Sequence, residues 1–228
     1  MTHGIRYGEL TVISAGTGQG KSTLTRQLAV HLLEHGERIG YIALEESNRR
    51  TALGLMSVAT GKALHLGEHS KETLQEAYDY TLKDWNLYLY DHFGSADPDL
   101  IYSRIEYLAL ALEAKTIFLD HLSILISGLD GDERKMIDTT MTKLRSLVER
   151  TGIKLFLVSH IRRTQTDKNH EEGARVTLGQ LRGSAAISQL ADEVIGLERD
   201  QQEGAIDQTT VRVLKNRYSG EVGVACQL

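Results

Sequence analysis

The sequence has almost none of the features that mark exported, membrane-spanning or disulfide-bonded proteins. Among its 228 residues there is one cysteine, Cys226, so no internal disulfide can form and nothing requires an oxidising compartment. No apolar run approaches the roughly 20 residues that span a bilayer, and the segment from Met1 to Arg6 has no signal-peptide core. We therefore expect a soluble, cytoplasmic protein with no membrane partner.

Proline and an excess of positive charge are also missing. Pro98 is the only proline, and no Ser/Gly-rich linker, repeat or low-complexity tract interrupts the chain. We therefore expect one domain over residues 1–228, which is long enough to bury a large core. The formal net charge of −5 argues against a uniformly basic nucleic-acid binder, so any DNA contact must be local.

Short apolar runs alternate with longer helix-periodic segments, as expected for an α/β protein with a mostly parallel sheet. The pattern predicts strands at 10–14, 39–44, 87–90, 116–119, 155–158 and 194–195, and helices at 21–35, 97–113, 132–151 and from Ser47 and Ser184. The region 61–86 is expected to be a polar helical insertion. A hairpin around Gly204 and final strands at 209–215 and 222–226 predict an antiparallel addition at the sheet edge.

A glycine-rich segment lies between the first strand and the first helix, which is the context that a Walker A phosphate loop requires. Its backbone N–H groups and the helix N-terminus would bind phosphate, Lys21 would reach the β and γ phosphates, and Ser22 would bind Mg²⁺. Ala15 replaces the first consensus glycine, so that position must avoid a positive φ. The alternative is a flexible glycine turn that caps a helix. The expected nucleotide contacts are Gly16, Thr17, Gly18, Gln19, Gly20, Lys21, Ser22 and Thr23.

Carboxylates follow two of the other predicted strands. Asp120 ends the strand 116–119, where a Walker B carboxylate would hold the Mg²⁺ shell beside the phosphate loop; the alternative is a turn or cap residue. Glu45 and Glu46 end the second strand, and one of them can serve as the base that accepts a proton from water. Either one can instead be a solvated glutamate in the first turn of a helix.

Three further groups occupy positions suited to phosphate contacts. His160 closes the strand after Asp120, where it can sense the γ-phosphate, although a lone histidine is usually structural. Lys215 and Arg217 lie two apart at the end of a predicted strand and so share one face. They can form an arginine finger that acts on a neighbour's nucleotide, or they can simply be solvated residues at a strand end. Arg162, Arg163 and Lys168 form a basic loop that can reach a DNA backbone in a central channel, or is simply solvated.

The order of these motifs resembles the helicase domain of the T-odd phage primase-helicases, with mitochondrial Twinkle and the bacterial DnaB-type helicases as more distant relatives. The resemblance covers nearly the whole chain. Its most specific segments are 44–47 (Leu-Glu-Glu-Ser), 132–138 with 141–144, 170–173 (His-Glu-Glu-Gly), 181–184 (Leu-Arg-Gly-Ser) and 197–199 (Leu-Glu-Arg).

The resemblance implies a RecA-like P-loop NTPase core that hydrolyses a nucleoside triphosphate, ATP or dTTP, with Mg²⁺. It also implies a ring hexamer in the parent protein, acting on single-stranded and forked DNA in an infected bacterial host. At the nucleotide, the resemblance implies Glu45 as the base, Asp120 as a Mg²⁺ ligand and His160 as the γ-phosphate sensor. It implies that Arg217, assisted by Lys215, is the arginine finger in trans and that Arg199 lies near the nucleotide base. The 161–175 loop, with Arg182, Gly183 and Ser184, would contact DNA.

The family's N-terminal primase part and linker helix have no counterpart in this sequence, and an aromatic residue that stacks on the base in the relatives would fall just beyond Leu228. Two classes of function compete on these grounds. One is a ring helicase that couples hydrolysis to translocation on single-stranded DNA. The other is a RecA-type recombinase that uses the nucleotide to switch a filament on DNA. The segment 182–184 and the pair Lys215 and Arg217 favour the helicase.

Overall fold

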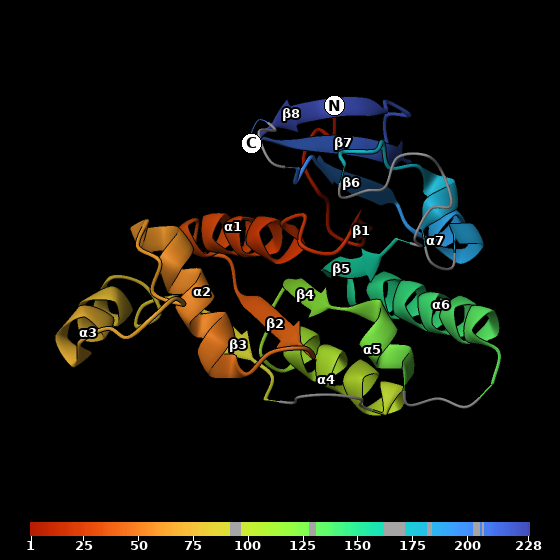
Figure 1. The fold of residues 1–228 in the computed structure, drawn as a ribbon. Coiled ribbons are helices and arrows are strands. Elements are labelled where there is room, and N and C mark those ends of the chain that lie inside the picture. Colours follow the sequence, from red (N-terminus) through yellow and green to blue (C-terminus); the bar gives the residue numbers. More distant parts are fainter. Residues whose placement is uncertain (92–96, 128–130, 162–171, 182–183, 203–205, 207) are drawn as a thin grey trace.

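An eight-stranded sheet forms the centre of the molecule (Figure 1). The structure is a computed structural model, and it describes residues 1–228 except 92–96, 128–130, 162–171, 182–183, 203–205, 207 and the side chain of Ser184. The strands are β1 (Leu10–Ala15), β2 (Ile39–Ala43), β3 (Leu87–Leu89), β4 (Thr116–Asp120), β5 (Lys154–His160), β6 (Glu193–Arg199), β7 (Thr209–Asn216) and β8 (Gly223–Gln227). Their order across the sheet is β3-β2-β4-β5-β1-β6-β7-β8.

The sheet is parallel from β3 to β6 and antiparallel from β6 to β8. This arrangement confirms the expected α/β fold with a mostly parallel sheet and an antiparallel edge. The hairpin predicted around Gly204 lies outside the described residues, but the strands on either side of it, β6 and β7, do pair with each other.

The helices cover both faces of the sheet (Figure 1). They are α1 (Lys21–Glu34), α2 (Asn48–Thr60), α3 (Lys71–Tyr80), α4 (Pro98–Leu110), α5 (Leu122–Ser127), α6 (Glu133–Thr151) and α7 (Ser184–Leu190), with a 3₁₀ turn η1 (Leu178–Gln180). Among the described helices, none is both long and apolar enough to cross a membrane.

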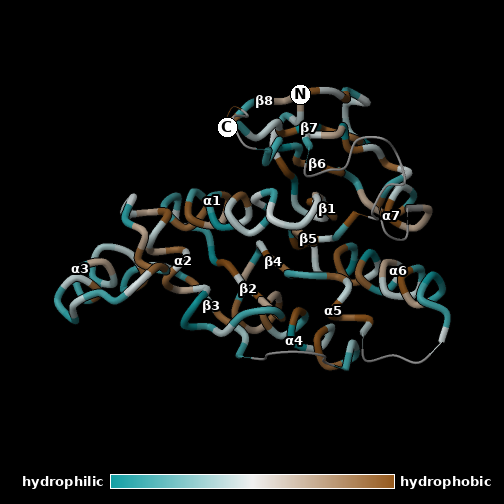
Figure 2. Tube along the Cα trace, in the orientation of Figure 1, coloured by the Kyte–Doolittle hydropathy of each residue, from teal (hydrophilic) through white to brown (hydrophobic). Residues whose placement is uncertain are grey.

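Two apolar cores lie on opposite faces of the sheet, because successive side chains of a strand point to opposite sides. In β1, Val12 packs into the core under α4, α5, α6 and α7, and Ile13 packs into the core under α1 and α2. Hydrophobic residues gather in the strands and on the adjoining helices, whereas α3, at the periphery, is largely hydrophilic (Figure 2). The sheet is therefore buried on both sides through its centre.

Local signals account for the ends of several helices. Ser47 accepts a hydrogen bond from Arg50 N and caps α2, as predicted, and Asp132 caps α6 through Arg134 N and Lys135 N. The region 61–86 is only partly helical, since α3 begins at Lys71. The short helix α5, which begins two residues after Asp120, was not predicted from the sequence.

The strand order brings the predicted chemical groups to one edge of the sheet. The adjacent strands β2, β4, β5 and β1 are parallel, so their carboxyl ends meet at the same edge. Glu45, Asp120, His160 and the loop from Gly16 follow or end these strands in that order. The fold thus assembles a site from four neighbouring strand ends.

Candidate nucleotide site

The loop after β1 has the backbone that its glycines permit. Gly18 has a φ of 74° and Gly20, the residue that precedes α1, has a φ of 89°, both in the left-handed region that glycine adopts without strain. Ala15 is the last residue of β1, and its φ is not positive, so replacing the consensus glycine does not strain the backbone. The loop leads directly into the N-terminus of α1, where backbone N–H groups suit an anion.

Lys21 is folded back into this loop. Its Nζ donates to the carbonyl oxygens of Ala15 at 3.0 Å and Gly16 at 2.7 Å, and only 8% of the residue is exposed. Burial lowers the pKa of Lys21, and the nearby carboxylates of Asp120 and Glu45 partly offset that effect. The amine is therefore held at the loop, where it can turn to a phosphate.

The segment after β6 lies against the same loop. Buried Gln19 accepts a hydrogen bond from Gly16 N through Oε1 at 3.0 Å, and its Nε2 donates to Arg199 O at 3.3 Å. A side chain at Gly18 would meet Gln201 Nε2 at 3.1 Å. Arg199, which the resemblance places near the nucleotide base, thus has its backbone beside the phosphate loop.

Ser22 and Asp120 face each other across the site, with Ser22 Oγ donating to Asp120 Oδ2 at 3.4 Å. Burial raises the pKa of Asp120; the nearby Glu45 and Glu46 also raise it, while His121 and Lys21 lower it. A hydroxyl and a carboxylate close together, with a second carboxylate nearby, are the oxygen donors that Mg²⁺ prefers. The residues present therefore fit a magnesium ion.

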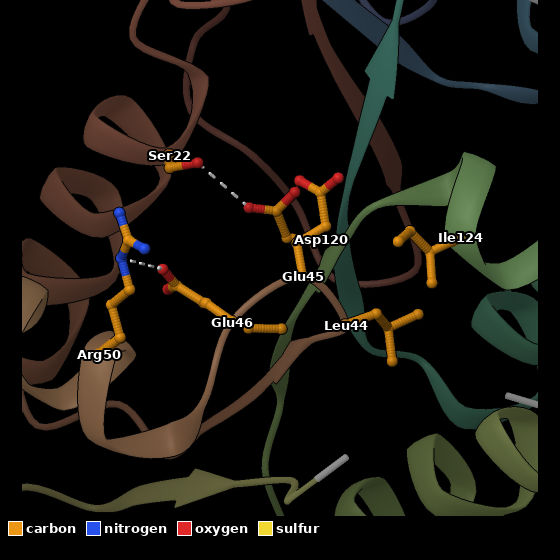
Figure 3. A pocket seen from close by; sticks show the side chains of 8 residues that line it. Ser22, Leu44, Glu45, Glu46, Arg50, Asp120 and Ile124 are labelled. Atoms are coloured by element: carbon orange, nitrogen blue, oxygen red, sulfur yellow. Dashed lines mark hydrogen bonds and ion pairs between the residues drawn. The ribbon is translucent and has the colours of Figure 1, made fainter. Parts of the chain in front are cut away.

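The two adjacent glutamates point to different places (Figure 3). Glu46 binds Arg26 Nη2 through both carboxylate oxygens at 2.7 Å and accepts a hydrogen bond from Thr51 Oγ1 at 2.8 Å. Glu45 turns toward Asp120, and its side chain is 53% exposed. Of the two glutamates, Glu45 therefore has the more exposed side chain.

A pocket of about 490 Å³ opens between these groups. Ser22, Glu45 and Asp120 point into it, while Arg50 approaches Glu46 at one side (Figure 3). The remaining lining comes from Ala43, Leu44 and Ile124. The pocket reaches Ser22, in the first turn of α1, directly after the phosphate loop.

His121 is a site residue that the sequence analysis missed. Its Nε2 lies 2.6 Å from Glu45 Oε1, its Nδ1 accepts a hydrogen bond from Ser123 N at 3.1 Å, and its ring meets the ring of His160 edge to face at 4.3 Å. The only signal in the sequence is its position directly after Asp120. It is 4% exposed, so a buried imidazole joins the ends of β2, β4 and β5.

Lys215 and Arg217 lie far from this site. Lys215 pairs with Val194 at the beginning of β6, and its Nζ donates to Ser188 O and Ala191 O. Arg217 donates to Asp192 Oδ1 at 2.9 Å, and Asp192 also accepts from Leu10 N at the start of β1. The phosphate loop follows the other end of β1, about 17 Å away for a strand of this length.

The residues predicted to contact DNA fall in segments outside the described part of the chain, or at its border. Arg162, Arg163, Lys168, Arg182 and Gly183 lie outside the described residues. Ser184 is the first residue of α7, but its side chain is also outside them. Thr17 and Thr23 belong to the phosphate loop and the first turn of α1.

Comparison with known proteins identifies the class to which this fold and site belong. The family model described as "DnaB-like helicase C terminal domain" matches residues 1–227. The chain therefore belongs to the DnaB-like helicase C-terminal domain family, as the resemblance predicted.

Individual relatives agree with this assignment. The DNA helicase/primase of Enterobacteria phage T3 is 38% identical over 98% of this chain and 41% of its own length. The replicative DNA helicase DnaB of Helicobacter pylori strain 26695 is 25% identical over 87% of this chain and 41% of its own length. The chain thus spans about two fifths of these curated relatives.

Solved structures show the same fold. The structure titled "ATPase Domain of G40P" superposes with a TM-score of 0.78 at 18% identity, over 98% of this chain and 82% of that one. At this identity the likeness concerns the fold alone.

Proposed function

We propose that this protein is the motor domain of a replicative DNA helicase, which hydrolyses a nucleoside triphosphate to translocate on single-stranded DNA and to unwind duplex. Family membership and the phage relative support this proposal. The single observation that carries it is the division of roles at 45–46, where Glu46 is bound to Arg26 and Glu45 faces Asp120 in the pocket. A phosphate loop alone would not imply hydrolysis.

The chain's own residues divide the hydrolytic work. Lys21 and the N-terminus of α1 bind and orient the phosphates. Glu45 accepts a proton from the attacking water. His160, at the end of β5, contacts the γ-phosphate and senses its loss. Mg²⁺ held by Ser22 and Asp120 would supply positive charge to balance the phosphate oxygens.

Arg217 acts in trans, on the nucleotide of a neighbouring subunit. Its place at the amino end of β1 supports this role, since the protein's own phosphate loop is at the carboxyl end of that strand. A cation supplied by a neighbour stabilises charge on the γ-phosphoryl oxygens only when subunits meet. Lys215 assists Arg217, and Arg199 lies near the nucleotide base.

The proposal includes the partners that such a motor needs. Subunits form a ring, and the basic loop with Arg162, Arg163 and Lys168, together with 182–184, contacts single-stranded DNA in its hole. The nucleotide is ATP or dTTP, the substrate is a DNA fork, and the place of action is the cytoplasm of an infected bacterium.

Unwinding of a forked duplex, compared with strand exchange in the same preparation, tests the proposal. We expect nucleotide-dependent unwinding and no strand exchange. Glu45→Gln should still bind nucleotide but lose hydrolysis and unwinding, because an amide cannot accept the proton. Glu46→Gln is the matched control and should retain hydrolysis. Strand exchange without unwinding would favour the recombinase. Loss of hydrolysis in Glu46→Gln alone would mean that Glu46, and not Glu45, is the base.

A further inference from the structure

We propose that His121 is a positioning residue that holds the base Glu45 in place for hydrolysis, an inference that rests on the proposed function. His121 contacts Glu45, with 2.6 Å between Nε2 and Oε1, and its ring also meets the ring of His160. Glu45 comes from the loop after β2, and His160 from the end of β5. A single buried ring therefore joins the base to the γ-phosphate sensor.

A backbone contact fixes which nitrogen of His121 carries the proton. Ser123 N donates to Nδ1 at 3.1 Å, so Nδ1 must be unprotonated and a neutral ring carries its proton on Nε2. Nε2 is the atom that faces Glu45. The start of α5 thus makes His121 a hydrogen-bond donor toward the base.

The donor is fixed, whereas the base is exposed. His121 is 4% exposed, and the side chain of Glu45 is 53% exposed. The two atoms are close, yet Nε2 makes no hydrogen bond of good geometry within the described residues. A buried donor without a partner costs free energy, so a rotation of Glu45 that aligns the pair is favoured.

A metal ion is the other use for such a cluster. Ligand atoms of Glu45, His121 and His160 lie within 4.8 Å of one another, as they do in transition-metal sites. A metal on Nε2 of His121 would leave the ring proton on Nδ1, where it would oppose the N–H of Ser123. The backbone contact therefore favours a hydrogen bond to Glu45.

Two amide substitutions separate the acceptor function of Nδ1 in His121 from the donor function of Nε2. In His121→Gln the side-chain N–H can take the place of Nε2–H, whereas the shorter side chain of His121→Asn can accept from Ser123 N but does not reach Glu45. We expect His121→Asn to lower kcat by about 10- to 100-fold, with KM and nucleotide affinity little changed. His121→Gln should recover most of the turnover.

A double-mutant cycle with Glu45→Gln tests whether His121 acts through the base. We expect His121→Asn to cause no further loss once Glu45 is an amide. An equal loss in both backgrounds, or no rescue by His121→Gln, would assign a merely structural role and overturn the proposal. Parent turnover in His121→Asn, with turnover lost in Glu45→Gln, would overturn the role of His121 alone. Parent turnover in Glu45→Gln would instead overturn the proposed base, and this inference with it.

The tautomer can be measured without reference to activity. In protein labelled with ¹⁵N-histidine, the His121 signals are those that disappear in His121→Asn. We expect Nε2 to carry a proton and Nδ1 to lack one. A proton on Nδ1 would overturn the proposal.

Discussion

At the scale of single residues, the described part of the chain contains buried and partly buried carboxylates in contrasting surroundings. Glu46 is held by Arg26 and Thr51, and Asp192 by Arg145, Arg217 and a backbone N–H. Glu193, the first residue of β6, is 2% exposed, and neither of its carboxylate oxygens has a hydrogen-bond partner among the described residues. A buried carboxylate without a partner is stable mainly in its protonated form.

The pKa of Glu193 predicts how the protein's stability depends on pH. Burial, aided by the negative charge of Glu9, raises this pKa from 4.5 to about 7, although Arg6 and the N-terminus lower it. Because the folded-state pKa is raised, the favourable contribution of Glu193 to the stability of the fold is complete below pH 4.5. This contribution is lost as pH rises through about 7. Glu193→Gln should therefore raise the melting temperature at pH 8 and change it little at pH 5.

Thermal unfolding of the parent and Glu193→Gln across this pH range measures the effect. Glu9→Gln is a useful companion, since removing the neighbouring negative charge should lower the pKa of Glu193, so that the loss of stability becomes smaller and is complete at lower pH. A difference in melting temperature between the parent and Glu193→Gln that does not change with pH would contradict the assignment of the effect to ionisation of Glu193.

Residue identity was easier to predict than residue surroundings. The glycines, Lys21, Ser22 and Asp120 could be proposed as site residues from the sequence, because their spacing relative to a strand and a helix is the one that a phosphate loop requires. The choice between Glu45 and Glu46 depends on where Arg26 lies, 20 positions away in the sequence. His121 could not be recognised, because Glu45 and His160, the side chains that it contacts, come from two other strand ends.

At the scale of helices and strands, the side chain of Arg26 lies in the contact between α1 and α2. Arg26 of α1 crosses Gly54 of α2 on its way to Glu46, and a Cβ at Gly54 would lie 2.6 Å from Arg26 Nε. Glycine within a helix usually costs roughly 0.5–1 kcal/mol relative to alanine. Its presence here leaves room for the arginine that holds Glu46.

Gly54→Ala should therefore lower the melting temperature, against the usual effect of alanine in a helix, because Arg26 must leave Glu46. We expect a loss of about 1–3 kcal/mol, typical of an overpacked site. Gly179→Ala in η1 is the control, since its Cβ would meet nothing within 4 Å. A more stable Gly54→Ala protein would show that Arg26 has room to move.

The order and type of most elements followed from the periodicity of the sequence, because the central strands are continuous apolar runs. Two elements did not follow. The helix α5 is too short to show a period, and the segment 61–70 is polar without being helical. The order of strands across the sheet was predictable only as a mostly parallel arrangement with an antiparallel edge, since neighbours such as β1 and β5 are far apart in the sequence.

At the scale of the whole molecule, the two ends of the sheet have different chemistry. The carboxyl ends of β1, β2, β4 and β5 hold the phosphate loop, Glu45, Asp120 and His160. The amino end of β1 holds Asp192 and Arg217. Under the proposed action in trans, each subunit would offer Arg217 to one neighbour and receive the corresponding arginine from another, as in a head-to-tail ring.

Mixed rings test this central claim most directly. Arg217→Ala alone should bind nucleotide as the parent does but lose DNA-stimulated hydrolysis by about 10³-fold or more, and Lys21→Ala alone should not hydrolyse at all. When the two variants assemble together, some interfaces join an intact phosphate loop to an intact Arg217, so we predict that part of the hydrolysis returns. Confirmed assembly of mixed rings without any return of hydrolysis would contradict action in trans.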